Sequence, residues 1–199
     1  MTNVQSAPRE ASVERKTRET DIKLTLRLDG SGSAQIDSGI GYLNHMLEAL
    51  TKHAHFDLEL SCRGDLDVDG HHTTEDCALA LGRAIDTALG ERRGIRRFSH
   101  AYVPMDEALA RVAVDLSGRP WPEVHLGLKR ERLGQLACEN ITHFFQSLAI
   151  AMRASLHVDV LRGDNDHHRA EAAFKACALA LRQAIVVEGD AIVSTKGVL

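Results

Sequence analysis

Polar and apolar residues alternate at the start of both halves of the chain, and each alternating stretch leads into segments with apolar residues at helical spacing. Alternation predicts strands with one buried face, whereas apolar residues three and four apart predict amphipathic helices. The predicted strands are a hairpin within 11–28 that turns near Glu19–Asp21, then 34–37, 56–60, 101–103, 110–116, 124–128 and 156–160. The predicted helices are 42–52, 71 to about 90, 139–152 and 167 to about 187.

The same order of elements occurs twice, which indicates an internal duplication. Each half has hairpin strands, a helix that carries one histidine, another strand, a polar loop and a second helix. His143 follows His45 by 98 positions and His167 follows His71 by 96. We therefore predict an α+β fold in which each half forms a four-stranded sheet with two helices. The expected boundaries are a flexible arm at 1–10, half-repeats at 11–94 and 95–187, and a tail at 188–199.

Composition excludes several classes of protein. Hydrophobic residues make up 44% of the 199 residues, which is enough for a core. No apolar run approaches the ~18 residues of a membrane span, and the first twenty residues lack the apolar core of a signal peptide. A net charge of −4 argues against nucleic acid as the main partner. The four cysteines are scattered without a paired motif, so we expect free thiols and a cytoplasmic protein.

Candidate metal ligands come from a short repeated phrase, in which two adjacent histidines precede a glutamate. On a helix, the first histidine and the glutamate are four residues apart and share a face, which is the spacing of an imidazole and a carboxylate on one ion. Adjacent histidines point about 100° apart, so each pair should serve two different metals. The metals would be shared between halves, or across a subunit boundary. The other predicted helix of each half adds one histidine. The candidate ligands are then His45, His71, His72, Glu75, His143, His167, His168 and Glu171.

Imidazole and carboxylate without thiolate suit Mn, Fe, Zn or Ni, and favour a site with room for substrate over a closed structural site. Several cations could bind a phosphate: Arg96, Arg97, Arg119 and the Lys196 of a Ser-Thr-Lys-Gly tail. A solvated basic surface is the alternative for each of them. Lys175, four residues after Glu171, is a candidate ion-pair partner or substrate contact.

Several phrases of the chain resemble the imidazoleglycerol-phosphate dehydratase family, and together they cover nearly everything from about residue 14 onward. They are Asn44 to Leu47, His71 to Asp76, Asp106 to Ala108, Asp115 to Pro120, His143 to Leu148, His167 to Ala176 and Ser194 to Leu199. The resemblance implies dehydration of D-erythro-imidazole glycerol phosphate to imidazole acetol phosphate in L-histidine biosynthesis. It further implies a duplicated fold like that of ribosomal protein S5 domain 2, and the single-function form of the enzyme.

The resemblance also assigns partners and residues. It implies two Mn²⁺ per active site, bound by the eight ligands above, and an assembly of twenty-four subunits with sites at subunit boundaries. By matching position, Glu19 resembles a substrate-contacting acid from a neighbouring subunit, and Lys175 another substrate contact. The residues that resemble the phosphate site are Arg97, Arg119, Ser194 and Lys196. The chain has Ala49 where the family often has Gln, and its segment 188–193 is shorter than expected.

The chemistry agrees with these ligands. The proton to be removed lies on a carbon next to an imidazole ring, and a metal on the ring nitrogen would stabilise an imidazolate as a Lewis acid. Loss of hydroxide would then give a diazafulvene-type intermediate. We predict Glu171 as the main base, with Glu19, Glu75 and His45 as competitors. Two other functions stay open: a metallohydrolase that splits a phosphoester, and a metal-storage or structural assembly without turnover.

Overall fold

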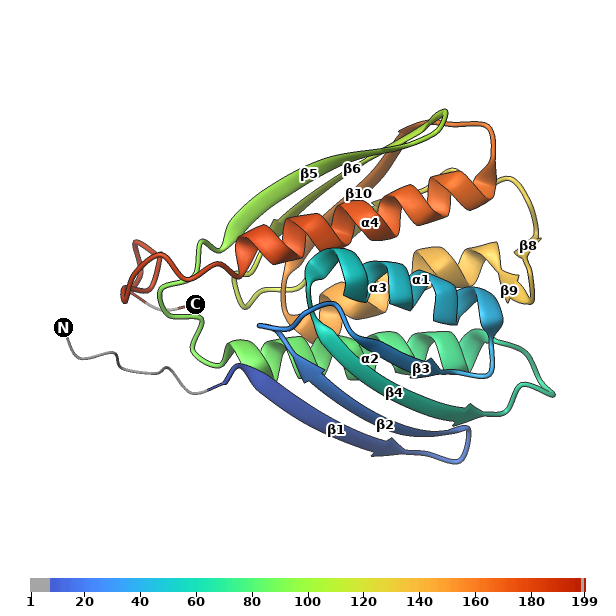
Figure 1. Ribbon diagram of the computed structural model, residues 1–199, viewed down its shortest axis with the longest axis horizontal. Helices are drawn as coiled ribbons and strands as arrows, with labels where there is room; N and C mark the ends of the chain where they lie inside the picture. Colours follow the sequence, from blue (N-terminus) through green and yellow to red (C-terminus); the bar gives the residue numbers. More distant parts are fainter. Residues whose placement is uncertain (1–7, 198) are drawn as a thin grey trace.

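Two four-stranded sheets enclose a layer of four helices (Figure 1). The computed structural model describes residues 8–197 and 199. The first sheet has the order β1-β2-β4-β3. Its strands are β1 (Glu10–Lys16), β2 (Thr20–Arg27), β3 (Ala34–Asp37) and β4 (Asp57–Gly64). The second sheet has the order β5-β6-β10-β7. Its strands are β5 (Phe98–Met105), β6 (Ala108–Asp115), β7 (Trp121–His125) and β10 (Ser155–Arg162).

The connectivity confirms the duplicated α+β fold. In each sheet an antiparallel hairpin pairs with a third strand, and that strand pairs in parallel with the strand at the far edge. Each half then contributes two helices to the shared middle layer. The helices are α1 (Gly41–Ala54), α2 (His71–Leu89), α3 (Cys138–Met152) and α4 (Asp166–Ala184).

The core lies between the helix layer and the inner faces of the sheets. Burial alternates along β2 and β6, as the sequence pattern predicted. Phe144, Phe145 and Phe174 form an aromatic centre with ring centroids 4.6–5.7 Å apart. Gly82 allows α2 to approach α3 closely, because a Cβ there would lie 2.7 Å from the carbonyl oxygen of Leu148. The two halves therefore share one core.

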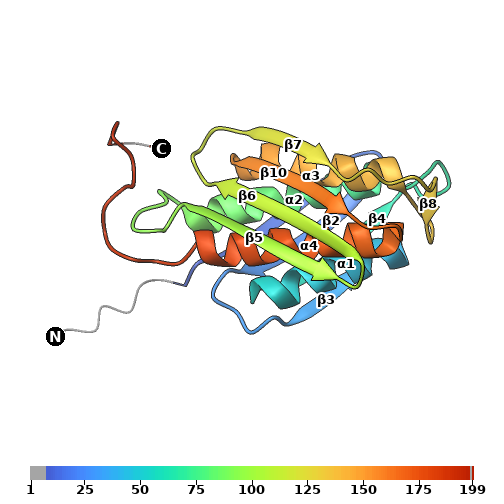
Figure 2. The ribbon, with the colours of Figure 1, turned by 90° about the horizontal axis from the view of Figure 1, so that it is seen from above.

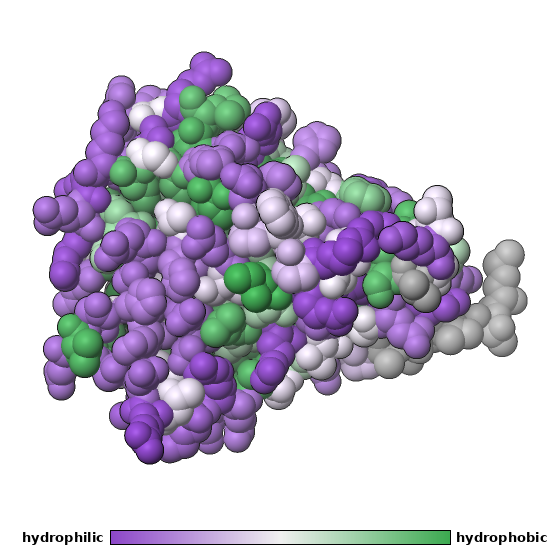
Figure 3. All heavy atoms as spheres, turned by 180° about the vertical axis from the view of Figure 1, so that it is seen from behind, coloured by the Kyte–Doolittle hydropathy of each residue, from purple (hydrophilic) through white to green (hydrophobic). Residues whose placement is uncertain are grey.

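All four helices begin at the same end of the molecule, the right-hand end in Figure 1. Figure 2 shows the second sheet lying across this parallel layer. The polypeptide approaches both termini at the opposite end. From behind, hydrophilic residues cover most of the surface and hydrophobic residues form small separate groups (Figure 3). Among the described residues, no helix is long and apolar enough to cross a membrane.

Three elements differ from the sequence-based prediction. Strand β7 occupies 121–125 rather than 124–128, because it pairs in parallel with β10 from Trp121 onward. Helix α4 ends at Ala184, since the next residues leave the helix: Arg96 N donates to Val186 O, and Val187 bridges Ile95. A small hairpin of β8 (Arg132–Leu133) and β9 (Leu136–Ala137) was not predicted.

The predicted N-terminal arm lies mostly outside the described residues, which begin at Pro8. The two last residues of that arm are in contact with the domain. Arg9 pairs with Asp29 and donates a hydrogen bond to the carbonyl oxygen of Ile185, and Glu10 begins β1. The N-terminal strand is thus tied to the segment that follows α4.

Candidate active site

Three of the predicted ligands meet where α2 lies beside α3. His71 and Glu75 come from the first two turns of α2, and His143 comes from the second turn of α3. His143 Nε2 lies 3.0 Å from Glu75 Oε1, and the rings of His71 and His143 stack with centroids 4.8 Å apart. Asn140 Oδ1 lies 3.1 Å from His71 Nδ1 and so orients that ring. We call these three residues the α2–α3 cluster.

A second trio forms where α1 lies beside α4, and we call it the α1–α4 cluster. Its members are His45 from α1 and His167 and Glu171 from α4. Both histidines approach the same carboxylate oxygen, Glu171 Oε2, at 3.3 Å and 3.1 Å. Lys175 Nζ lies 2.7 Å from the other oxygen. Burial alone would raise the pKa of the Glu171 carboxyl, but the hydrogen bond and charge of Lys175, together with the hydrogen bond of His167 and the charge of His45, lower it.

Each cluster joins a histidine from one half to a His–Glu pair from the other half, so neither half can form a site alone. In each cluster the ligand atoms lie within 4.8 Å of one another. Atoms bound about 2.1 Å from one ion are about 3–4 Å apart, which matches the His–Glu contacts. The donor set of two imidazoles and one carboxylate therefore fits a divalent metal and leaves coordination positions open.

The second histidine of the first pair points away from the α2–α3 cluster, as the helical geometry predicts. His72 Nδ1 lies 3.0 Å from the carboxylate of Asp65, which precedes α2. A carboxylate only accepts, so Nδ1 carries the proton and Nε2 keeps its lone pair for a metal. The same hydrogen bond raises the pKa of the His72 imidazole. Glu19, in the β1–β2 turn, lies 3.7 Å from His72 Nε2.

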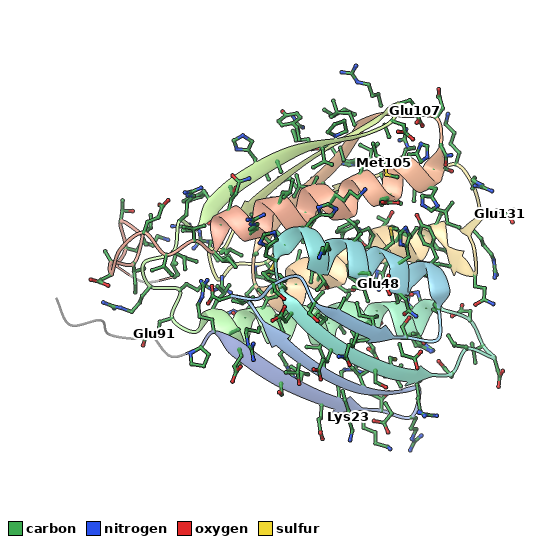
Figure 4. The ribbon with its side chains drawn as sticks, viewed as in Figure 1. Lys23, Glu48, Glu91, Met105, Glu107 and Glu131 are labelled. Atoms are coloured by element: carbon green, nitrogen blue, oxygen red, sulfur yellow. The ribbon has the colours of Figure 1, made fainter. Side chains whose placement is uncertain are left out.

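The second histidine of the other pair is held in the same way by a different element. His168 Nδ1 lies 2.8 Å from Glu107 Oε2, in the β5–β6 turn, and Asp106 lies 3.6 Å from Nε2. Glu107 also accepts the backbone N–H groups of Asp164 and Asn165, at 3.1 Å and 2.8 Å. Its hydrogen bond with His168, followed by that from Asn165, lowers the pKa of Glu107 to about 2. Figure 4 shows Glu107 at the tip of its hairpin.

Four of the residues predicted to bind phosphate converge elsewhere, around a cavity of about 500 Å³, whereas Arg96 pairs with Glu188 and does not line it. Arg97 is buried there, bound to Asp115 at 2.7 and 3.0 Å and to the carbonyl oxygen of Val193. The cavity is lined by Arg97, Phe98, Arg119, Val193, Ser194, Thr195 and Lys196. Although 188–193 is short, its hydrogen bonds with Gly94 bring the tail beside Arg97. A cationic cavity open to solvent can hold a phosphate.

The cavity and the clusters lie at opposite ends of one chain. His167 is in the first turn of α4, whereas the Arg97 backbone N–H donates to the last residue of that helix, Ala184. Seventeen residues separate His167 from Ala184, a rise of about 25 Å along the helix. The structure thus brings the phosphate residues together and the metal ligands together, but does not bring the two sets together within one chain.

Sequence reasoning did not identify the residues that orient the histidines: Asp65, Asn140 and Glu107. A carboxylate seven residues before His72 was a usable signal, because it lies in the loop that leads to the motif. Glu107 is 61 residues before His168, and only the register of the β5–β6 hairpin brings it there. The phrase around Asp106 contributed to the family resemblance without indicating this function.

Fold and geometry together define a duplicated α+β protein with two His/Glu clusters that could each hold a metal ion. The family model of imidazoleglycerol-phosphate dehydratase matches residues 38–181. The chain belongs to this family of hydro-lyases.

Relatives and solved structures cover most of the chain. The Chlorobium luteolum imidazoleglycerol-phosphate dehydratase is 52% identical over 194 residues, covering 98% of this chain and 97% of the relative. A Phytophthora nicotianae relative of the same name is 58% identical over 99% of this chain, which spans 44% of that longer protein.

Two crystal structures of this family have the same fold. The Pyrococcus furiosus protein, solved with (S)-C348, has a TM-score of 0.82 at 36% identity, covering 94% of this chain and 100% of that one. The Staphylococcus aureus protein has a TM-score of 0.81 at 34% identity, covering 89% and 99%.

Proposed function

We propose that this chain dehydrates D-erythro-imidazole glycerol phosphate to imidazole acetol phosphate for L-histidine biosynthesis in the cytoplasm, with two Mn²⁺ in each active site. The observation that carries the proposal is the pair of His/Glu clusters combined with a separate cationic cavity. A substrate with an imidazole at one end and a phosphate at the other needs both. A metallohydrolase would bind the phosphate on its metals and needs no separate cationic cavity for it, and a storage protein has no need for a phosphate cavity.

We further propose that the working site is built from more than one copy, in an assembly of twenty-four subunits. The clusters and the phosphate cavity are about 25 Å apart along α4, so one small substrate cannot reach both in one chain. Two further ligands, His72 and His168, point away from the clusters of their own chain. They are available to complete the coordination of metals held by neighbouring copies. Assembly is then expected to depend on metal.

The proposed ligands are the three residues of each cluster with His72 and His168. When bound, Mn²⁺ at the imidazole ring would act as a Lewis acid that stabilises the ring anion and so helps the hydroxyl leave from the carbon attached to the ring, while the proton is lost from the next carbon rather than from the one beside the ring. Arg97, Arg119, Ser194 and Lys196 would bind the phosphate and fix the substrate's orientation. Asp115 keeps the Arg97 guanidinium in place through two hydrogen bonds.

The proton transfer requires a carboxylate that is available to substrate. Glu171, predicted as the main base, has one oxygen beside Lys175 and the other shared by His45 and His167. We therefore propose that Glu171 is mainly a metal ligand. Lys175 would keep its carboxylate in place through their ion pair and would also contact substrate. Glu19, whose side chain is 53% exposed, is then the best placed base, ahead of Glu75 and His45. It would take the proton from carbon and return one to the departing hydroxyl.

The test is a turnover assay on metal-free protein reloaded with Mn²⁺, Zn²⁺ or no metal. We expect acetol phosphate product only with metal, and most with Mn²⁺. Release of inorganic phosphate instead would support the hydrolase, and metal-dependent assembly without either product would support the storage protein. Light scattering on the same samples measures the size of the assembly. Lack of product from the Mn-loaded, assembled protein would overturn the proposed function.

A further inference from the structure

Asp76 carries a buried carboxylate that the proposed mechanism does not use. It follows Glu75 directly on α2, and only 4% of the residue is exposed. Burying a charge is unfavourable unless it is paired and hydrogen-bonded. Arg15 Nη1 and Thr20 Oγ1 both donate to Asp76 Oδ2. These two partners come from β1 and β2, on either side of the hairpin turn that carries Glu19.

The turn itself is held by a closed set of hydrogen bonds. Thr17 Oγ1 accepts the backbone N–H groups of Glu19 and Thr20, at 3.1 Å and 3.0 Å, and Thr17 N donates to Thr20 O. Asp65 N donates to the carbonyl oxygen of Glu19 at 3.0 Å. The backbone of Glu19 is therefore fixed, although its carboxylate projects into solvent. Asp76 is the side chain that fastens this unit to the metal-bearing helix.

The second half lacks this anchor. Ala172 follows Glu171 at the position equivalent to Asp76. There the acid of the hairpin turn, Glu107, binds the loop before α4 through Asp164 N and Asn165 N. In the first half the helix supplies the carboxylate, Asp76, that binds the hairpin, and Glu19 of the turn does not have this function. A buried carboxylate that binds the hairpin thus occurs on the helix of the half whose turn carries the candidate base. The buried carboxylates of α4 have other partners, since Asp166 accepts the backbone N–H groups of Lys129 and Arg130, and Glu171 pairs with Lys175.

We propose that Asp76 is a positioning residue for Glu19, an inference that rests on the proposed function. It holds the β1–β2 turn against α2, so that Glu19 keeps its place beside His72 while Glu75 keeps its place in the α2–α3 cluster. Asp76 is one helical turn after His72 on α2, so its contacts set the distance between the base and this proposed metal ligand. An error of about 1 Å in such a distance can reduce turnover about 100-fold.

The main variant is Asp76→Asn, which retains the shape but removes the charge that Arg15 pairs with. Asp86→Asn is the matched control, because Asp86 lies on the same helix and pairs with Arg92 near its other end. We expect Asp76→Asn to lower kcat about tenfold with KM within about threefold and metal content unchanged. Backbone hydrogen exchange should rise in residues 15–21. Asp86→Asn should leave both kcat and this exchange unchanged.

A double-mutant cycle with Glu19→Gln separates positioning from a general loss of structure. If Asp76 acts through Glu19, the double variant should have the kcat of Glu19→Gln within about twofold. Multiplicative losses, or loss of metal in parallel with kcat, would overturn the inference. If Asp76→Asn fails to fold, Thr20→Val removes one of the two donors and should give the same pattern.

The inference and the proposed function fail in different ways. A wild-type protein that assembles with Mn²⁺ but makes no product would overturn the proposed function. If the wild-type protein is active but Asp76→Asn does not change hydrogen exchange in residues 15–21, only the inference about Asp76 is overturned.

Discussion

The β1–β2 and β5–β6 turns occupy equivalent places in the two halves, but their acidic side chains have different contacts. Glu107 of the β5–β6 turn orients His168 and accepts two backbone N–H groups. Glu19 of the β1–β2 turn lies 3.7 Å from His72 Nε2, too far for a hydrogen bond. In the first half, Asp65 orients the histidine instead.

Loop length explains this difference. Residues 65–70 connect β4 to α2, whereas only 163–165 connect β10 to α4. The longer loop supplies its own acid to orient His72, and the shorter loop relies on the acid of the hairpin. The two halves thus have structurally similar half-sites, and the longer loop of the first half leaves the Glu19 carboxylate available for its proposed function as the base.

The largest expected effect is on turnover after Glu19→Gln. We expect kcat to fall about 100-fold or more, because a neutral amide cannot accept the proton. The melting temperature should stay within about one degree, since the side chain is half exposed and makes no close hydrogen bond. Steady-state kinetics with Mn-loaded protein provides the measurement. The control is Glu14→Gln, on the exposed face of the same hairpin. An equal loss of kcat in this control would contradict a specific function of Glu19.

The next effect is on metal binding after Glu107→Gln. The amide has only one acceptor oxygen for three donors, so His168 loses its fixed orientation. We expect Mn²⁺ affinity to fall about 10–100-fold, with kcat at saturating metal much less affected than in Glu19→Gln. Metal titration by calorimetry measures the affinity. Glu131→Gln, exposed at the same end of the molecule (Figure 4), is the control. If Glu107→Gln lowered kcat as much as Glu19→Gln does, the acids of the two turns would have the same function and the comparison would be wrong.

Asp65→Asn should also lower Mn²⁺ affinity, and it should lower the free energy of unfolding less than Glu107→Gln does. Its carboxylate contacts His72, whereas Glu107 also accepts backbone groups of a helix entry. We expect about a tenfold loss of Mn²⁺ affinity. The exposed Asp67 of the same loop gives the control Asp67→Asn. If Asp65→Asn lowered kcat at saturating metal without changing the affinity, Asp65 would have a different function.

The smallest expected effect concerns the starts of α2 and α4. The Asn165 side chain, at the N-cap of α4, accepts His167 N at 2.9 Å. The N-cap of α2 is Gly70, and there the preceding Asp69 accepts His71 N at 2.7 Å. Asn165→Ala should lower the free energy of unfolding by about 1 kcal/mol. Urea unfolding of the metal-free protein measures this, and Asn165→Ser should retain most of the stability. Equal loss in both variants would contradict capping by this side chain.

Much of this architecture could be predicted from the chain alone. The alternating segments gave strands close to their observed positions, because a strand with one buried face leaves a period of two. The repeated His-His motif predicted that the two histidines of each pair diverge, because helix geometry fixes the angle between neighbouring residues, and His71 and His167 do lie in clusters that could hold a metal ion. The end of α4 could not be predicted, since the apolar residues after Ala184 suit a helix as well as the pairing they make with 95–96.

The partners of the histidines depend on contacts between distant segments. The contacts of Glu107 with His168 and of Asp76 with Thr20 each join a hairpin to a helix, and no local pattern encodes them. The separation of the metal ligands from the phosphate cavity is also tertiary information. It follows from the direction of α4, which the sequence does not reveal without the packing of the sheets.

The shared direction of the four helices has an electrostatic consequence. Each helix carries roughly half a positive charge at its N-terminus, and all four N-termini are at the end that holds both clusters. This field opposes the binding of cations and favours ionised carboxylates. Metal affinity there should therefore depend more steeply on Glu75 and Glu171 than on any single neutral imidazole. The same field should also attract anions to that end of the molecule, where the acidic side chains beside the two clusters already interact with it.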